Sequence, residues 1–541
     1  MGQVDQPPGT ASPPPDPSAE PVLDVDDIQG NILAGFNKDH QLLVALGLDN
    51  IDSARRWLRR ILPSINSLAE VGHFNATFRM QRARLGHDPI GLVATWVNIA
   101  FSHPGLAALT SGADADGVPD EAFKQGMPAR AGILGDASTK GDADPTAEWV
   151  IGGSTNVPDV LLIVASDDPD ELTKSLDRVR PASGDGPNPP RVIWQEKGAT
   201  RPDLPGHEHF GFRDGISQPG VRGRVSRSTG DFLTRRSLAS SSIGGLEFSA
   251  PGQALVWPGQ FVFGYPSTDG SSGSTGGPVP APEFSPCWLR NGSLLVFRRL
   301  TQDVAGFNQF LEASATKLAR TLAFAGISAD QLGAKIVGRW KSGAPILRSP
   351  QADNQNLGDC PFANNDFLFT IDTPPPNFKQ GAGWDGKQFT AASSDPLGFV
   401  CPHAAHIRKV NPRDQDTDKG DKFDTLKRRI IRRGIPFGPP LVNPLDDDGV
   451  ERGLHFLCYQ TSIIDQFELL QTDWANSLGN PKPGGHDLII GQLPGQPRSF
   501  DLDDGSGESA TVTTDRQYVV ATGGGYFFAP SISALRDVLA R

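Results

Sequence analysis

The 541-residue sequence predicts an α+β protein made of two similar halves. In the first half, the apolar run at residues 159–165 has the length of a buried strand, and an amphipathic stretch at residues 168–179 follows it directly. In the second half, a strand-like run at residues 293–299 precedes helical periodicity at residues 302–313. Strand-then-helix order in both halves favours a layered α+β fold over a helical bundle and suggests a duplicated unit.

Other segments of the first half carry the same two patterns. Apolar residues recur at helical spacing over residues 50–62, and Pro63 is expected to end that helix. Short apolar runs predict further strands at residues 92–97 and 191–195.

The second half is expected to alternate in the same way. A second helix is predicted at residues 316–324, strands at residues 366–372 and 453–460, and a helix at residues 463–478. Near the C-terminus we expect a strand at 517–521, a turn at the three following glycines, a strand at 526–529 and a helix at 531–539.

Composition divides the chain into four parts. Residues 1–22 are rich in Pro, Ser, Ala and Asp, bury almost nothing and are expected to form a disordered tail. Residues 23–220 are expected to form the first domain, which ends in a glycine loop. Residues 221–286 are rich in Gly, Ser and Pro and are expected to be inserted loops, and residues 287–541 are expected to form the second domain.

The charge balance excludes some classes of partner. The formal charge is -12, from 50 basic and 62 acidic side chains, which argues against a nucleic-acid binder. No apolar run is long enough to predict a membrane span. The N-terminus lacks the features of a Sec signal, which favours the cytoplasm, although a chain exported by another route would look the same.

Residues 401–438 carry the first candidate site. His403 and His406 precede a dense basic run, and a neutral imidazole can ligate a metal while a guanidinium steadies a developing anion. The alternatives are a solvated basic face, or a metal site made by the two histidines alone. The run contains Lys427, Arg428, Arg429, Arg432 and Arg433.

The second candidate is Asp214, in the glycine-rich segment HEHFGFRDGISQPG at residues 207–220. The glycines place this carboxylate on irregular backbone, where an aspartate is also a common turn former. Nearby His207 and His209 are expected to be structural. Cys401 and Cys458 are expected to be small core residues rather than metal ligands.

Several motifs together resemble the dye-decolourising peroxidase family of haem proteins, and the resemblance runs from residue 25 to the C-terminus. The most characteristic is GFRDG at residues 211–215, which ISQP follows. The others are IQGNIL at 28–33, LLVFRRL at 294–300, AHIRKVNPR at 405–413, RRGIPFG at 432–438 and GLHFLCYQTSIIDQFE at 453–468.

The resemblance implies a fold, a cofactor and roles for four residues. It implies two ferredoxin-like domains with antiparallel sheets, and haem b held mainly by the C-terminal domain. His406 resembles the proximal ligand of the haem iron, and Asp214 resembles the distal acid and base. Arg432 resembles the distal arginine that also contacts haem, and Arg413 a residue that contacts a haem propionate.

The function that the resemblance implies is a peroxidase that reduces hydrogen peroxide and oxidises dyes, phenols or other small organic reductants in one-electron steps. Two alternatives are a haem-handling protein of the deferrochelatase kind and a haem-binding module without catalysis. At the position of Phe437 some family members carry a tyrosine that relays electrons from the surface. Phenylalanine forms no stable phenoxyl radical, so a relay here needs another tyrosine or a tryptophan.

Overall fold

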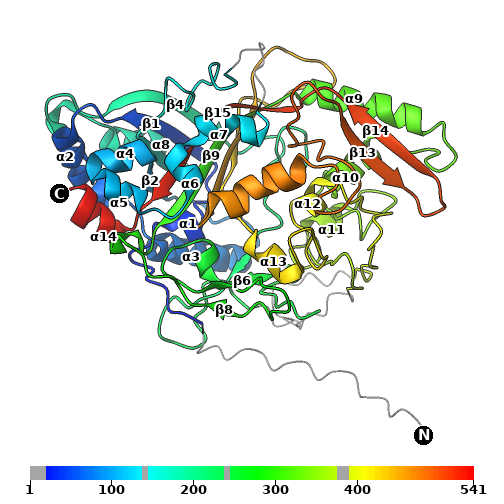
Figure 1. The fold of residues 1–541 in the computed structure, drawn as a ribbon, viewed down its shortest axis with the longest axis horizontal. Helices are drawn as coiled ribbons and strands as arrows, with labels where there is room; N and C mark the ends of the chain where they lie inside the picture. The colour runs from blue at the N-terminus through cyan, green and yellow to red at the C-terminus, as the bar shows by residue number, and fades with distance from the viewer. Residues whose placement is uncertain (1–19, 137–143, 237–243, 374–388) are drawn as a thin grey trace, which may run out of the picture.

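The computed structural model describes residues 20–136, 144–236, 244–373 and 389–541 (Figure 1). At its centre lies a nine-stranded sheet to which both halves contribute. The first half supplies four strands in the order β4, β1, β3, β2. These are β1 (His40–Gly47), β2 (Thr95–Phe101), β3 (Val160–Ser166) and β4 (Arg191–Ala199).

The second half repeats this connectivity. The order across this half is β15, β9, β12 and then β10 with β11, two short strands that together take the place of one. All these pairs are antiparallel, which confirms the predicted α+β class. The strands are β9 (Ser293–Gln302), the interrupted pair β10 (Ile431–Arg432) and β11 (Ile435–Phe437), β12 (Gly453–Gln460) and β15 (Val519–Ala529).

The two halves meet at two places, one inside the sheet and one between its outer strands. Strands β15 and β2 pair through Phe528 and Phe101. Strand β4 approaches β11 closely, since a Cβ atom on Gly198 would lie 2.6 Å from Cγ2 of Ile435. Because strands of both halves share one sheet, the predicted domain boundaries at residues 220 and 287 stay predictions.

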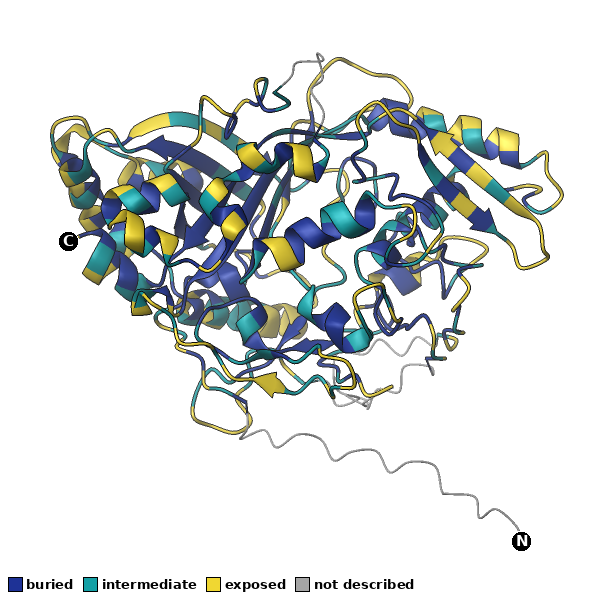
Figure 2. Cartoon of the chain, in the orientation of Figure 1, coloured by how far each residue is buried: buried dark blue, intermediate teal, exposed yellow. Residues whose placement is uncertain are grey.

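Alternate residues of each strand serve two separate hydrophobic cores, as the pleat requires. In β9, Leu295 and Phe297 belong to one core, whereas Leu294 and Val296 belong to the other. Helices α2 (Ile51–Ile61) and α8 (Pro169–Val179) contribute buried side chains to the second of these cores. Figure 2 shows the strands largely buried and the outer faces of these helices exposed.

Most of the predicted elements are confirmed. The helix predicted at residues 50–62 is α2, the strand at 453–460 is β12, and the helix at 463–478 is formed by η6 (Ile463–Glu468) and η7 (Leu470–Ala475). The helices predicted at 302–313 and 316–324 are one helix, α9 (Val304–Leu318), beyond which the chain turns. No helix among the described residues is long and apolar enough to cross a membrane.

The predicted glycine turn near the C-terminus is wrong, because the three glycines lie inside the single strand β15. They allow another segment to approach the strand. Gly152 has a φ of +75°, and a Cβ atom on it would lie 1.6 Å from the carbonyl oxygen of Gly524. A glycine run in a strand therefore marks close backbone contact here rather than a reversal of the chain.

The strand predicted at residues 366–372 is also absent. The carboxylate of Asp414 accepts hydrogen bonds from the backbone N–H groups of Phe369 and Thr370, at 2.7 and 2.9 Å. A side chain thus supplies the acceptor that a neighbouring strand would have supplied.

Parts of two low-complexity segments pack against the body of the protein. Residues 1–19 of the expected tail lie outside the described residues, but Glu20 is buried and bonds to Arg222 and Arg236. Within the expected inserted loops, Phe248 and Phe261 belong to the core that contains Phe297. Sparse aromatic residues therefore attach residues 244–286 to the body of the protein.

Candidate active site

His406 begins the short helix α12 (His406–Lys409) and points one ring nitrogen at a buried carboxylate. Nδ1 of His406 lies 2.7 Å from Oδ2 of Asp487. Oδ1 of Asp487 accepts the N–H groups of Ile489 and Ile490 at 2.8 and 3.1 Å. Burial alone would raise the pKa of Asp487, but His406 and these N–H groups outweigh it and lower the pKa.

The ionised carboxylate fixes the tautomer of the histidine. An ionised carboxylate only accepts, so Nδ1 of His406 carries the proton and donates it, and Nε2 keeps its lone pair. Nε2 has no hydrogen-bond partner among the described residues. His406 therefore presents a free nitrogen ligand whose ring is held from behind.

Asp214 and Arg432 form an ion pair that faces the same space. Nη1 of Arg432 donates to Oδ1 of Asp214 at 2.7 Å, and the side chains of Arg432 and Asp214 are 27% and 37% exposed, respectively. Burial opposes ionisation of Asp214, but the charge of Arg432 and the N–H of Gly215 outweigh it and lower the pKa of this carboxyl. The charges of Asp214 and His406 also act on each other.

The glycine loop is shaped by a half-buried glutamate. Both carboxylate oxygens of Glu208 accept backbone N–H groups, from Phe210 and Phe212, each at 2.8 Å. Downstream, the side chain of Gln218 bonds both the N–H and the carbonyl of Arg432, at 3.2 and 3.0 Å. The loop thus holds Asp214 and the backbone of Arg432 in one rigid unit.

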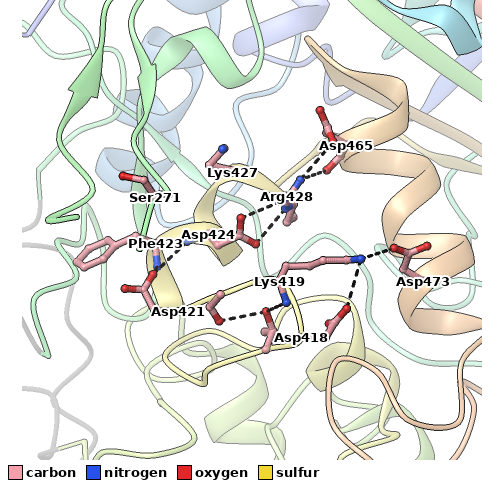
Figure 3. Close-up of polar contacts among 12 residues, drawn as sticks. Ser271, Asp418, Lys419, Asp421, Phe423, Asp424, Lys427, Arg428, Asp465 and Asp473 are labelled. Atoms are coloured by element: carbon pink, nitrogen blue, oxygen red, sulfur yellow. Dashed lines mark hydrogen bonds and ion pairs between the residues drawn. The ribbon is translucent and has the colours of Figure 1, made fainter. Parts of the chain in front are cut away.

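The basic run divides into two parts with different roles. Arg428, just after α13 (Lys422–Lys427), pairs with Asp424 and Asp465, and Lys419 pairs with Asp473 (Figure 3). These cations are neutralised by neighbouring carboxylates, and Arg428, with its side chain 13% exposed, does not form part of a solvated basic face.

Arg433 is directed away from the site that Arg432 faces. Its guanidinium donates to the carbonyl groups of Asn31, Ile32 and Leu33 at the end of α1 (Gly30–Leu33). The motif at residues 28–33 therefore has a structural role, because its backbone carbonyl groups bind Arg433.

Two further arginines, the buried Arg413 and the half-buried Arg429, have no carboxylate partner among the described residues. Arg413 donates to the carbonyl of Phe367 at 2.7 Å and to Oδ1 of Asn365 at 2.6 Å, and Arg429 donates to Oδ1 of Asn411 at 2.7 Å. Neither forms an ion pair with a described residue. Burial, added to the charges of neighbouring arginines, lowers the pKa of each to about 9.

The positive charge of these arginines, which no described carboxylate neutralises, is compatible with bound haem. Buried cations need anionic partners, and haem carries two propionates. The charges of Arg413 and Arg432 both act on Arg429, and the charge of Arg432 also acts on His406. A free imidazole nitrogen and two guanidinium groups that form no ion pair with a described carboxylate are features that suit a haem site. The sequence did not single out Asp487, and it gave Arg429 no role of its own.

The other sequence candidates do not form sites. Burial lowers the pKa of His403 to about 4, and no group of three or more His, Cys, Asp or Glu among the described residues is arranged to hold a metal. Burial raises the pKa of Cys401 to about 12 and that of Cys458 well above its ordinary value. Both cysteines lie in the hydrophobic cores, as expected.

Comparisons with known proteins agree with this geometry. Residues 27–202 match the family model of the DyP dimeric alpha+beta barrel domain. The chain is 33% identical over 540 residues to Peroxidase 2 of Mycetinis scorodonius, and the match covers 96% of this chain and 88% of the relative. It is 32% identical over 547 residues to a dye-decolorizing peroxidase of Mycena epipterygia, with 96% and 88% covered.

Solved structures give the same result. An ancestral D-type dye-decolorizing peroxidase is 34% identical with a TM-score of 0.73, and the match covers 96% of this chain and 100% of that one. A fungal DyP-type peroxidase from Auricularia auricula-judae is 30% identical with a TM-score of 0.69, with 96% and 99% covered.

The fold, the site and these relatives define a haem-dependent peroxidase. Within that class, the chain belongs to the dye-decolourising peroxidase family, because the similarity extends over nearly its whole length. The predicted family, fold, cofactor and enzyme class are therefore confirmed, and the two non-peroxidase alternatives have no support.

Proposed function

We propose that this peroxidase reduces hydrogen peroxide with Asp214 and Arg432 and then oxidises small organic reductants in one-electron steps. The observation that carries the proposal is the 2.7 Å ion pair between these two residues, whose charges both act on His406. Haem held by His406 supplies the redox-active iron at which peroxide is reduced.

Asp214 has a free oxygen for proton transfer. Oδ1 accepts hydrogen bonds from Nη1 of Arg432 at 2.7 Å and from the N–H of Gly215 at 2.6 Å. Oδ2 has no partner among the described residues. Peroxide must lose a proton from one oxygen and gain one on the oxygen that leaves as water. An ionised Asp214 accepts the first proton at Oδ2 and returns it to the leaving oxygen.

Arg432 supports this step in two ways. Its charge keeps Asp214 ionised when peroxide arrives, and it stabilises negative charge on the separating oxygens. On the opposite side, Asp487 gives His406 partial imidazolate character, which favours higher oxidation states of a bound iron. Arg413 and Arg429 are the proposed partners of the propionates.

The reductants are proposed to be small molecules, such as phenols, that enter the haem pocket. All four tyrosines are buried, and Phe437 lies stacked on His455 with the ring centroids 4.8 Å apart. A surface tyrosine relay therefore has no candidate in this chain. The net negative charge also disfavours large anionic dyes at neutral pH.

The test is an absorption spectrum of the purified protein before and after one equivalent of hydrogen peroxide. We expect a Soret band that falls and shifts within seconds and recovers when a phenol is added. His406→Ala is expected to lose or loosen haem. A Soret band indifferent to peroxide, or full haem retention in His406→Ala, would contradict the proposal.

A further inference from the structure

Lys409, the last residue of α12, is a fully buried cation one helical turn beyond His406. Its Nζ donates to the carbonyl oxygens of Asn480 and Gly485, at 2.7 and 2.6 Å. It forms no ion pair with a described residue. Burying an unpaired ammonium is costly, so a purely mechanical anchor would be better served by a neutral donor.

Two observations connect this cation to the histidine and carboxylate pair. The carbonyl of Gly485 lies two residues before Asp487 in the chain, so Lys409 holds the segment that carries Asp487. Burial lowers the pKa of Lys409 to about 8, and the negative charge of Asp487 is the largest influence that opposes it. Lys409 and Asp487 are therefore within electrostatic reach of each other inside the protein.

We propose that Lys409 is a positioning residue that limits how strongly Asp487 draws the proton of His406 and thereby raises the reduction potential of the bound haem. The inference rests on the proposed role of His406 as the haem ligand. A positive charge beside Asp487 stabilises the carboxylate as an anion, so His406 keeps more of its proton and donates less charge to the iron. The same charge directly favours the reduced iron, which carries one more electron. Both effects raise the reduction potential of the haem.

The chain offers a matched control in Lys335 of α10 (Ala329–Val337). Its Nζ also donates to two backbone carbonyls, of Phe399 and Val400, at 3.0 and 3.2 Å. Burial likewise lowers the pKa of Lys335, but the carboxylates that act on it are Asp395 and Asp504. Lys335 is less buried than Lys409, but it shares the two carbonyl acceptors without the connection to Asp487.

The experiment measures the midpoint potential of the haem-loaded protein at pH 6, where Lys409 is protonated. Lys409→Met removes the charge and the hydrogen bonds, whereas Lys409→Gln removes the charge and keeps a donor. We expect the potential to fall in both variants and to stay unchanged in Lys335→Met. We also expect Asp487→Asn to raise the potential, the opposite sign.

The outcomes separate the two proposals. If the variants and the parent bind haem and share one potential, or if Lys335→Met falls as far as Lys409→Met, Lys409 is only a structural anchor and the inference is overturned. If Lys409→Gln retains the parental potential while Lys409→Met falls, the hydrogen bonds rather than the charge are responsible, and the inference is again overturned. A parent protein without a Soret band would remove the proposed function, and the inference with it.

Discussion

Asp214 and Arg432 lie 218 residues apart in the sequence, and their side chains meet at 2.7 Å. The pair leaves Oδ2 of Asp214 free to move a proton. Asp214→Asn removes that base while keeping the size of the side chain, so we expect kcat/KM for hydrogen peroxide to fall by about 10²- to 10⁴-fold. Steady-state kinetics on the haem-loaded variant would measure this.

The control is Asp359→Asn. Asp359 bonds Arg213, the residue before Asp214, but it lies at the protein surface. Asp359→Asn makes the same aspartate-to-asparagine change beside the same loop, and we expect nearly parental turnover of this variant. Equal losses in the two variants would show that loop order, not proton transfer, limits the rate.

The lowered pKa of Asp214 sets the acid side of the pH profile. Because Arg432 helps to keep this carboxyl ionised, the parent should retain kcat/KM for peroxide as pH falls toward the ordinary aspartate value of about 3.9. Arg432→Leu removes the charge and raises the pKa of Asp214, so the acid limb should move to higher pH. A parental profile that peaks above neutrality, or an unmoved limb in the variant, would contradict this assignment.

The hydrogen bonds of Glu196 are expected to make the free energy of unfolding depend on pH. Its carboxylate accepts His455 at 2.6 Å and Arg299 at 2.7 Å. Burial raises its pKa, but these hydrogen bonds outweigh burial and lower the pKa from 4.5 to about 2. The folded-state pKa is lowered, so this stabilisation is complete above pH 4.5 and is lost as pH falls toward 2.

We therefore expect Glu196→Gln to reduce the free energy of unfolding at pH 7 by about 3 kcal/mol. The difference from the parent should shrink below pH 4.5, where the parent loses the same interaction. Denaturant unfolding at several pH values measures this. Glu171→Gln, in an exposed pair with Lys174, is the control and should change stability by less than about 0.5 kcal/mol. A pH-independent difference for Glu196→Gln would indicate lost packing instead.

A side chain at Gly152 is expected to destabilise the protein, because this glycine lies directly against the backbone of β15. Alanine there would need a φ of +75° and would place Cβ 1.6 Å from the carbonyl oxygen of Gly524. We expect Gly152→Ala to cost about 3 kcal/mol or more. At Gly132, in α7 (Met127–Leu134), a Cβ atom would meet no heavy atom within 4 Å, so Gly132→Ala should stabilise the protein by about 0.5–1 kcal/mol. Thermal unfolding of both variants would test the contrast, and similar midpoints would refute it.

Local pattern was enough to predict the elements whose signal lies within a few residues. The apolar run at β3 and the amphipathic stretch at α8 folded as expected, because burial of one continuous strand and one helix face satisfies both. The pattern failed at residues 366–372, where the partner of the backbone is the distant Asp414. It failed again at the glycines of β15, whose neighbour is the distant Gly152.

The candidate site divides in the same way. The family motifs singled out His406, Asp214 and Arg432, because these motifs are short and contiguous in the sequence. They did not identify Asp487, which lies 81 residues from His406 in an inconspicuous stretch. No local signal distinguishes an aspartate that will be buried behind a ligand from one that caps a turn.

The sequence by itself determined the α+β class, the alternation of strands and helices and the residue types of the site, because backbone periodicity and motif chemistry are local properties. Only the tertiary structure decided that Asp487 supports His406, that Arg433 binds the end of α1, and that Arg413 and Arg429 form no ion pair among the described residues. Charge pairing and burial depend on which segments the fold brings together, and those segments lie far apart in the chain.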